Sequence, residues 1–337
     1  MARILITGAS GFVGRATVEA AQSEGHEVVA LGRRAASIRS VVTGTEAYQS
    51  LDLAHADAEK LLGSLLGEVD AVIHAAAAMI GDDATHARAT LAPMKTLLAA
   101  IESCKRPPRV VLVSSLAVYG FAALPDGTLL NELTPLESET HKRDAYCRAK
   151  LTQEALAEEA ARAFGLDLWL IRPGAIYGPK RLETARLGMQ IRGRWISPGG
   201  NPTIPAVDVT RVAAALVAAA TVPKPKGKAA SGPMRPHAVV INVLDTDQPR
   251  QSDWAGAVGT DVTTVPKALF FRTATYLELL GDLLPGIGRK VPKSLLPPRL
   301  AARFKHLRYA TQRAEDILGL TAPSTSIDRL RAYAAME

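Results

Sequence analysis

The feature that most constrains this chain is a glycine-rich turn placed directly after a short apolar strand at the N-terminus. Residues 3–7 read RILIT, which predicts a buried strand, and residues 12–24 place their apolar side chains mostly on one side of a helix. Gly8, Gly11 and Gly14 stand between them with a GxxGxxG spacing. Gly8 permits the tight turn, Gly11 lets the backbone approach a pyrophosphate, and Gly14 lets the helix pack against the sheet.

The same turn opens a helix, and the first N–H groups of a helix are unpaired and carry a partial positive charge. A glycine triplet alone is weak evidence, but one placed between a strand and a helix predicts a site for cofactor phosphates. The alternative is a purely structural turn. The residues expected to bind the cofactor here are Gly8, Ser10, Gly11, Phe12, Val13 and Gly14.

Short apolar runs then alternate with helical segments. Strands are predicted at 27–31, 70–74, 109–113, 167–172 and 237–244, and helices at 145–164 and 208–220. This alternation is typical of parallel strands buried on both faces, so the expected fold class is α/β, a doubly wound parallel-sheet NAD(P)-binding Rossmann fold with a smaller C-terminal substrate lobe. The expected boundaries are 1–178 plus about 205–245 for the dinucleotide-binding domain, and 179–204 with 246–337 for the lobe.

Composition excludes several classes of protein. Hydrophobic residues make up 47% of the 337 residues, which is enough apolar material to exclude disorder for most of the chain. Cys104 and Cys147 are the two cysteines, and seven scattered histidines accompany them, so neither a disulfide framework nor a zinc site is expected. There is no apolar run long enough for a transmembrane helix, and residues 1–8 read as a mature strand, so we expect a cytoplasmic protein.

Charge is distributed unevenly along the chain. Residues 1–180 hold 18 basic and 21 acidic side chains, whereas residues 181–337 hold 22 basic and 12 acidic ones. Basic and aromatic residues do not alternate as they do in single-strand-binding proteins, so a nucleic-acid partner is not expected. The basic stretch 286–313, with leucines between its cations, predicts either a surface helix with one packed face or a peripheral contact with a lipid-like substrate or membrane.

The end of the second predicted strand bears on the choice of cofactor. An acidic residue at this point would bind the ribose hydroxyls of NAD. The chain instead has Arg33 and Arg34 there, and guanidinium groups suit a ribose phosphate because they offer bidentate hydrogen bonds and opposite charge. NADP(H) is therefore favoured over NAD(H). The alternative is that both arginines are solvated loop residues.

Tyr146 and Lys150 lie four residues apart on the predicted helix 145–164, which places both side chains on one face. An ammonium group close to a phenol stabilises the phenolate and lowers the pKa of the tyrosine, so that it can exchange a proton with a carbonyl or carbinol oxygen near neutral pH. Ser114 and Ser115 end a buried strand at the edge where sheet ligands bind, and Ser115 can donate a hydrogen bond to the substrate oxygen. The alternative role for Ser115 is a helix or loop cap.

Four ordered motifs together resemble the extended short-chain dehydrogenase/reductase superfamily, also called the NAD-dependent epimerase/dehydratase family. The resemblance covers residues 1–245 well and the remainder in outline. The motifs are Thr7–Gly14 (TGASGFVG), Ser114–Gly120 (SSLAVYG), Tyr146–Lys150 (YCRAK) and Arg172–Pro179 (RPGAIYGP).

The resemblance implies a role for each matching residue. Tyr146 is expected as the acid/base, Lys150 as its partner and as an anchor for the cofactor ribose, and Ser115 as the donor to the substrate oxygen. Other matching positions are expected to line the cofactor: His74, Ala75 and Ala76 beside its length, Asp52 and Leu53 at the adenine, Ser114 near the catalytic serine, and Pro173, Gly174 and Ile176 near the nicotinamide.

The chain departs from the family pattern at three places. Many relatives carry an asparagine where Thr90–Thr96 now lies, so a supporting hydrogen bond is in question, and Pro93 is expected to interrupt a helix there. Leu116 and Ala117 replace the acidic pair that sugar dehydratases carry after the catalytic hydroxyl residue, which argues against dehydration. Arg211 replaces an aspartate in the stretch VDVTRVA, and the sequence provides no physical account of that change.

Two enzyme functions remain open, and a third function belongs to another class. The favoured one is an NADP(H)-dependent oxidoreductase acting on a carbonyl or secondary alcohol of a small, fairly apolar substrate. The alternative is a nucleotide-sugar epimerase, for which the basic residues of 180–194 could hold a pyrophosphate. A non-catalytic NADP sensor is disfavoured because Tyr146 and Lys150 are both present. Relatives often dimerise through helices that include the Tyr–Lys helix, so a homodimer is one option.

Overall fold

The computed structural model describes residues 1–33, 48–55, 57–191, 194–197, 200–225, 231–232, 235–266, 297–321 and 325–336. Three of the positions discussed above lie outside these residues: Arg34, residues 192–193 of the basic segment 180–194, and the part of the basic stretch between 286 and 296. Among the described residues, there is no helix with the length and apolar character needed to cross a membrane.

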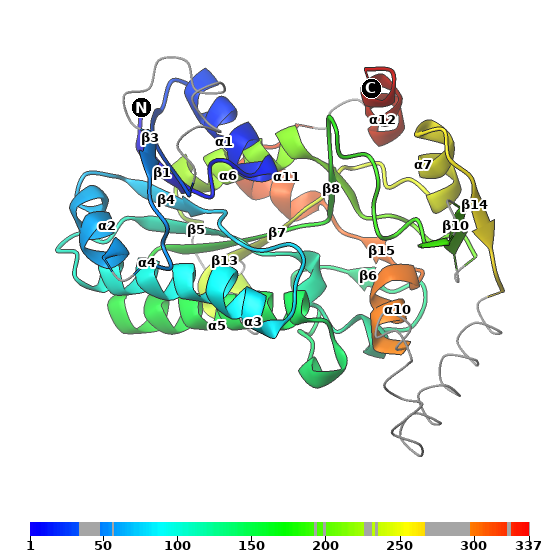
Figure 1. Ribbon diagram of the computed structural model, residues 1–337, viewed down its shortest axis with the longest axis horizontal. Helices are drawn as coiled ribbons and strands as arrows, with labels where there is room; N and C mark the ends of the chain where they lie inside the picture. The colour runs from blue at the N-terminus through cyan, green and yellow to red at the C-terminus, as the bar shows by residue number, and fades with distance from the viewer. Residues whose placement is uncertain are drawn as a thin grey trace.

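The centre of the molecule is an eight-stranded sheet with the strand order β12-β13-β7-β5-β4-β1-β2-β3 (Figure 1). All neighbouring pairs are parallel except β12 with β13. The strands are β1 (Arg3–Thr7), β2 (Glu27–Gly32), β3 (Tyr48–Ser50), β4 (Ala71–His74), β5 (Arg109–Val113), β7 (Leu168–Pro173), β12 (Ser231–Gly232) and β13 (Arg235–Val243). The chain order reverses at β1, which lies between β4 and β2, so the crevice at the carboxyl ends of these strands is the place where such sheets bind ligands.

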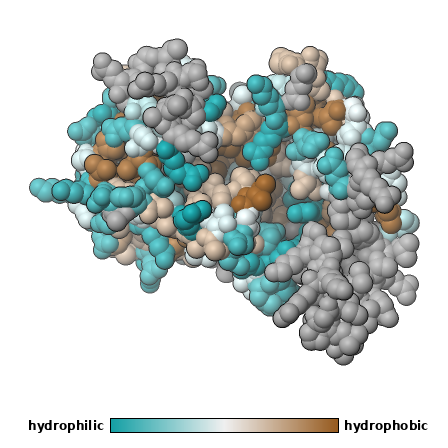
Figure 2. All heavy atoms as spheres, viewed as in Figure 1, coloured by the Kyte–Doolittle hydropathy of each residue, from teal (hydrophilic) through white to brown (hydrophobic). Residues whose placement is uncertain are grey.

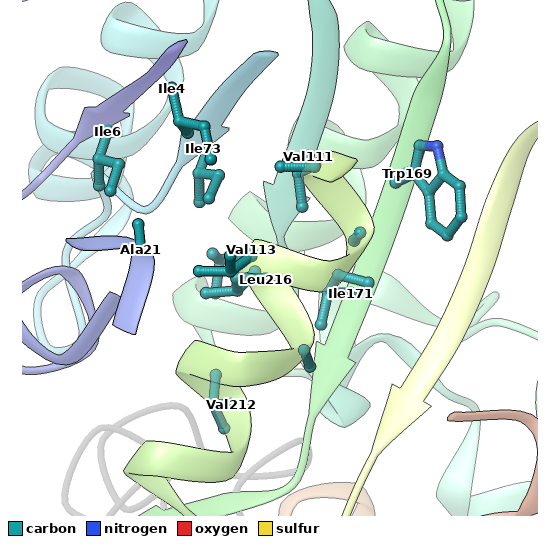
Figure 3. Close-up of a cluster of buried hydrophobic side chains, with 14 of the residues drawn as sticks. Ile4, Ile6, Ala21, Ile73, Val111, Val113, Trp169, Ile171, Val212 and Leu216 are labelled. Carbon is teal, nitrogen blue, oxygen red and sulfur yellow. The ribbon is translucent and has the colours of Figure 1, made fainter. Parts of the chain in front are cut away.

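Helices cover both faces of the sheet (Figure 1). One face carries α1 (Phe12–Ser23), α6 (Val209–Thr221) and α11 (Gln312–Leu318); the other carries α2 (Ala58–Leu66), α4 (Ala92–Glu102) and α5 (Ala145–Phe164). Alternate residues of each strand enter the two cores because side chains point to opposite faces. Ile4 and Ile6 belong to the same core as Ala21 of α1 and Leu216 of α6 (Figure 3), whereas Leu5 packs with the core under α4 and α5. The predicted doubly wound α/β Rossmann fold is therefore confirmed.

Smaller elements lie beside the sheet. They are α3 (Asp83–His86), β6 (Leu129–Leu130), β8 (Ala175–Tyr177), β9 (Met189–Ile191), β10 (Arg194–Ser197), β11 (Ala206–Asp208), α7 (Gln251–Ala257), β14 (Val262–Thr264), α10 (Pro297–Phe304), β15 (Arg308–Tyr309) and α12 (Ser326–Ala334). Three of them, α3, β8 and α10, contribute residues to the cavities at the crevice. The surface is notched between the half that carries α1 and the half that carries α7 and α12, and apolar side chains lie within the recess (Figure 2).

Pro93 does not interrupt its helix, which corrects the expectation from sequence. Helical backbone runs without a break from α3 through a π-helical turn (Ala87–Leu91) into α4. Pro93 lies in the first turn of α4, where a missing N–H is tolerated. Within the π turn the N–H of Ala92 reaches back five residues to the carbonyl of Ala87.

Candidate active site

The glycine loop after β1 is packed so tightly that Gly8 and Gly14 have no room for a side chain. Gly8 has a φ of +69°, and a Cβ on it would lie 2.7 Å from the backbone nitrogen of Ala76. A Cβ on Gly14 would collide with the Gly8 carbonyl oxygen, because helix α1 lies directly against the loop. Gly11 differs from both, since its nearest contact would be the Gly8 carbonyl oxygen at 3.2 Å and its free side faces the crevice.

Helix α1 begins without a side-chain cap. Its N-cap residue is Gly11, and its first turn contains no acidic residue. The first N–H groups of an α-helix have no partner inside the helix, so those of α1 are available to an anion at the crevice. The loop and the helix end therefore fit the phosphates of a dinucleotide.

A cavity on the β2 side of the glycine loop fits the adenosine half of a dinucleotide. Asp52 and Leu53, the two positions expected at the adenine, lie in its wall together with Arg33. The hydroxyl of Tyr48 donates to the carbonyl of Gly32 at 2.9 Å, which ties the end of β2 to β3. The remaining lining includes Gly8, Ser10, Gly11, Ala75, Ala76, Arg88, Ala89 and Pro93.

A second cavity continues past the glycine loop toward β5 and β7. Its wall brings together residues that lie far apart in the sequence: Phe12, Val13, Gly14, Ser114, Ser115, Tyr146, Lys150, Pro173, Gly174 and Ile176. Arg181 lies over the Phe12 ring at 5.2 Å from its centroid, at the rim of this cavity. Gly8 and Gly11 line both cavities, so the two cavities meet at the glycine loop.

His74, which the resemblance places beside the cofactor, lies outside the walls of both cavities. Ala75 lines both cavities, but His74 is 1% exposed and does not line either of them. Its Nδ1 lies 2.9 Å from the hydroxyl of Thr7, so it joins β4 to β1 beneath the crevice. Burial, and secondarily the charge of Lys150, lower the pKa of His74 to about 3, and the ring is neutral at neutral pH.

Tyr146 and Ser115 meet at the junction of the cofactor cavity and a further cavity. Tyr146 is the second residue of α5. The N-cap of this helix is Asp144, whose carboxylate accepts a hydrogen bond from the N–H of Cys147 at 2.8 Å. Ser115 precedes a short 3-10 turn and accepts from the N–H of Ala117 at 3.1 Å, so it also acts as the cap considered from sequence. Its side chain is hydrogen-bonded to Tyr146 as well.

The expected lowering of the Tyr146 pKa is wrong. Burial raises the pKa of the Tyr146 phenol, and the hydrogen bond with Ser115 opposes that shift only in part. The ammonium of Lys150 is directed elsewhere, since it donates to the carbonyl of Val113 at 2.7 Å and to Gln153 Oε1 at 3.0 Å. Burial lowers the pKa of Lys150 to about 8, against the attraction of Glu154.

A fully buried charge network supports this site from below. Glu154 Oε1 accepts from Arg172 Nε at 2.8 Å and from the hydroxyl of Ser114 at 2.6 Å, and its Oε2 accepts from Arg172 Nη2 at 2.7 Å. Burial alone would raise the pKa of Glu154, but Arg172 and the hydrogen bonds hold it below its usual value. The Ser114 hydroxyl is thus held by this network, which joins α5 to β5 and β7 behind the catalytic candidates.

The further cavity, of about 450 Å³, opens on the other side of Tyr146. Apolar side chains form part of its wall: Met79, Ile80, Leu116 and Phe121. Three arginines that are not paired with carboxylates in the described structure also line it, namely Arg186, Arg299 and Arg303. Burial lowers the pKa of Arg303. The carboxylate of Asp144, which also lines the cavity, opposes that shift, and repulsion from Arg186 adds to it.

Helix α10 explains how the basic stretch contributes to this cavity. Leu300 and Phe304 are 1% and 0% exposed, so the apolar face of the helix packs into the protein. Arg299 and Arg303, one turn apart, line the cavity. The described part of the stretch therefore uses its apolar side chains for internal packing, as in the surface-helix alternative.

Sequence reasoning missed three residues of the helical segment 83–102. Arg88 lines the adenosine cavity, and His86 lines the cavity beside Tyr146, with ring centroids 6.1 Å apart. Thr90 replaces the missing asparagine as a support, because its hydroxyl oxygen accepts the N–H of Ala78 at 3.0 Å. Helical spacing alone could not identify them, since which face of this helix meets the crevice depends on tertiary packing.

Arg211 now has a physical account. Its Nε donates to the carbonyl of Leu244 at 2.9 Å, and its Nη1 donates to the carbonyl of Thr321. Leu244 directly follows β13, and Thr321 lies in the C-terminal part of the chain. The arginine therefore joins α6 to distant segments that a shorter aspartate could not reach.

Comparisons with known proteins agree with this geometry. The sequence profile of the NAD dependent epimerase/dehydratase family matches residues 4–228. The chain belongs to this family. Its fold is similar to that of UDP-glucose 4-epimerase from Brucella ovis in complex with NAD, with a TM-score of 0.69, 19% identity, and coverage of 100% of this chain and 98% of the other.

Two curated enzymes are similar in sequence over part of their length. A dTDP-6-deoxy-L-talose 4-dehydrogenase (NAD(P)(+)) from Kitasatospora kifunensis is 26% identical over 56% of this chain and 57% of its own length. A dTDP-4-dehydro-6-deoxy-D-allose reductase from Streptomyces sp is 27% identical over 52% of this chain and 56% of its own. The chain spans about half the length of these relatives. The proteins that resemble this chain thus include redox enzymes, similar in sequence, and an epimerase, similar in fold.

Proposed function

We propose that this chain is an NADP(H)-dependent oxidoreductase that transfers a hydride between the nicotinamide and a carbonyl or secondary-alcohol carbon, with Tyr146 as the acid/base. The observation that carries this proposal is that Tyr146 and Ser115 line both the second cofactor cavity and the further cavity. A substrate carbon at this junction faces the cofactor on one side and the phenol on the other. A bound nicotinamide cofactor supplies or accepts the hydride.

The protonation states at the junction favour the reductive direction. Because its pKa is raised, the Tyr146 phenol is protonated at neutral pH and can give its proton to a carbonyl oxygen as negative charge develops there. The Ser115 hydroxyl, already hydrogen-bonded to Tyr146, can donate to the same oxygen. Lys150 lines the cofactor cavity and is the proposed anchor for the ribose hydroxyls.

The proposed preference for NADP(H) rests on the adenosine cavity. Arg33 lies in its wall at the end of β2, and Asp52 is the carboxylate residue of that wall. Asp52 Oδ1 accepts the N–H of Ala54 at 3.0 Å, so its carboxylate is engaged in a local turn. A guanidinium at the ribose position suits a 2′-phosphate.

The proposed substrate has an apolar body and an anionic group. Met79 and Phe121 provide apolar contacts in the further cavity, while Arg186, Arg299 and Arg303 supply positive charge. Guanidinium groups bind phosphate and carboxylate with two parallel hydrogen bonds. The same arginines are the observation that favours a second candidate function, a nucleotide-sugar epimerase, because a sugar nucleotide carries a diphosphate.

One experiment tests the proposal and separates the two functions. Purified protein is unfolded mildly to release any retained cofactor, and binding of NADP(H) and NAD(H) to the refolded chain is then measured by calorimetry. Exchangeable NADPH, with affinity reduced in Arg33→Ala, supports the oxidoreductase. Tightly retained NAD(H) with no net NADPH consumption supports the epimerase. If neither dinucleotide binds, the glycine loop has only a structural role.

The acid/base role is tested on a carbonyl substrate found by screening NADPH oxidation. Tyr146→Phe keeps the ring and removes the proton, so turnover is expected to fall at least about 100-fold. Lys150→Met is expected to weaken cofactor binding, and Lys95→Met, at an exposed position of α4, is its control. Full turnover in Tyr146→Phe would refute the proposed proton path.

A further inference from the structure

Arg88 and Arg33 both line the adenosine cavity, but they follow strands on opposite sides of β1. Arg33 follows β2, whereas Arg88 lies in the π-helical turn that comes after β4, and these strands flank β1 and its glycine loop. The two guanidinium-bearing positions therefore reach the same cavity from either side of the loop that fits the cofactor phosphates.

Arg88 is available to bind an anionic ligand. The side chain is exposed, and it makes no ion pair with the residues that the structure describes. The wall of the cavity holds Arg33, Arg88 and the single carboxylate of Asp52, which accepts a backbone N–H nearby. The cavity thus has an excess of positive charge and suits an anion.

Arg88 lies within the π-helical turn Ala87–Leu91. Ala89 and Pro93 line the same cavity, and Pro93 follows Arg88 by five residues, which is the hydrogen-bond spacing of a π-helix. Pro93 has no N–H to bond the carbonyl four residues before it, so the ordinary helical ladder cannot continue through this point. Short π segments of this kind are often found at functional sites.

We propose that Arg88 binds a phosphate group of the dinucleotide cofactor and acts with Arg33 as a two-sided clamp. The inference rests on the proposed use of a nicotinamide dinucleotide. The phosphate has two sources: the pyrophosphate, which NAD⁺ and NADP⁺ share, and the 2′-phosphate, which only NADP⁺ carries. Cofactor binding alone can distinguish them, so the substrate does not need to be known.

The test compares Arg88→Gln with Lys95→Gln by calorimetric titration of NADP⁺ and NAD⁺. Lys95 is an exposed cation of α4 that does not line the cavity. Its variant therefore makes the same change in net charge without changing the cavity wall. Arg88→Gln is expected to weaken NADP⁺ binding about tenfold, because charge-assisted hydrogen bonds to phosphate are lost. Lys95→Gln is expected to change it less than twofold, and Arg88→Lys to retain part of the affinity.

The pattern of losses decides the outcome. Weakening of both dinucleotides assigns Arg88 to the pyrophosphate, and weakening of NADP⁺ alone assigns it to the 2′-phosphate; both support the inference. Unchanged affinity in Arg88→Gln, while the unaltered chain binds NADP⁺, overturns the inference and leaves the proposed function intact. Failure of the unaltered chain to bind either dinucleotide overturns both. Unchanged melting temperatures confirm that the exposed substitutions leave the fold intact.

Discussion

Glu154→Gln is expected to destabilise the protein strongly, because it removes the charge that compensates Arg172. The two side chains are 0% and 2% exposed and share two hydrogen bonds of 2.8 and 2.7 Å. Arg235 Nε also lies 3.4 Å from Glu154 Oε2, so two cations lose their partner at once. Glutamine keeps the shape of the side chain, and the cost of an unpaired buried charge is about 3–5 kcal/mol of unfolding free energy.

Urea unfolding followed by circular dichroism measures this cost. Glu159→Gln, an exposed position on the same helix, is the control and should change the unfolding free energy by less than about 0.5 kcal/mol. The double variant Glu154→Gln/Arg172→Met removes both charges and should recover about 2 kcal/mol of the loss. If Glu154→Gln lies within about 1 kcal/mol of the unaltered protein, or the double variant recovers nothing, the reasoning about this pair is refuted.

Three further outcomes are expected. Gly14→Ala should abolish cofactor binding and lower the melting temperature, because the new Cβ collides with the Gly8 carbonyl; normal binding in calorimetry would contradict this. Thr90→Val should cost about 1 kcal/mol, because the half-buried N–H of Ala78 loses its acceptor, whereas Thr90→Ser should retain most of that stability in the same unfolding assay. His74 is neutral in the native state with a pKa of about 3, against 6.5 unfolded, so the unfolded chain binds the extra proton and stability falls as pH drops from 6.5 toward 3. The His74 contribution to that loss is about 3 kcal/mol by pH 4, and an equally steep acid limb in His74→Asn would argue against it.

The fold class followed from local patterns that need no knowledge of distant contacts. The run RILIT, the glycines at 8, 11 and 14, and the alternation of short apolar strands with helices each constrain the backbone within a few residues. Helix α5 spans Ala145–Phe164, the predicted range, because Asp144 caps one end and Gly165 at a φ of +68° ends the other. Such signals are readable because their physical causes are local in the chain.

The charge environment of the site could not be read in the same way. The spacing of Tyr146 and Lys150 places them on one face, but only the packed structure directs the Lys150 ammonium to Val113 and Gln153 and raises the Tyr146 pKa by burial. The pKa of a side chain depends on everything packed around it, including groups far away in the sequence.

Sequence alone therefore determined the parallel sheet, the glycine-rich turn and the order of the candidate catalytic residues, since each is carried by neighbours along the chain. Tertiary structure decided that Arg88 faces the adenosine cavity and that Arg303 of α10 faces the cavity beside Tyr146. It also decided that His74 lies beneath the crevice rather than in its wall. Those placements arise when apolar faces such as that of Leu300 and Phe304 are buried, and burial brings together residues that no local spacing relates.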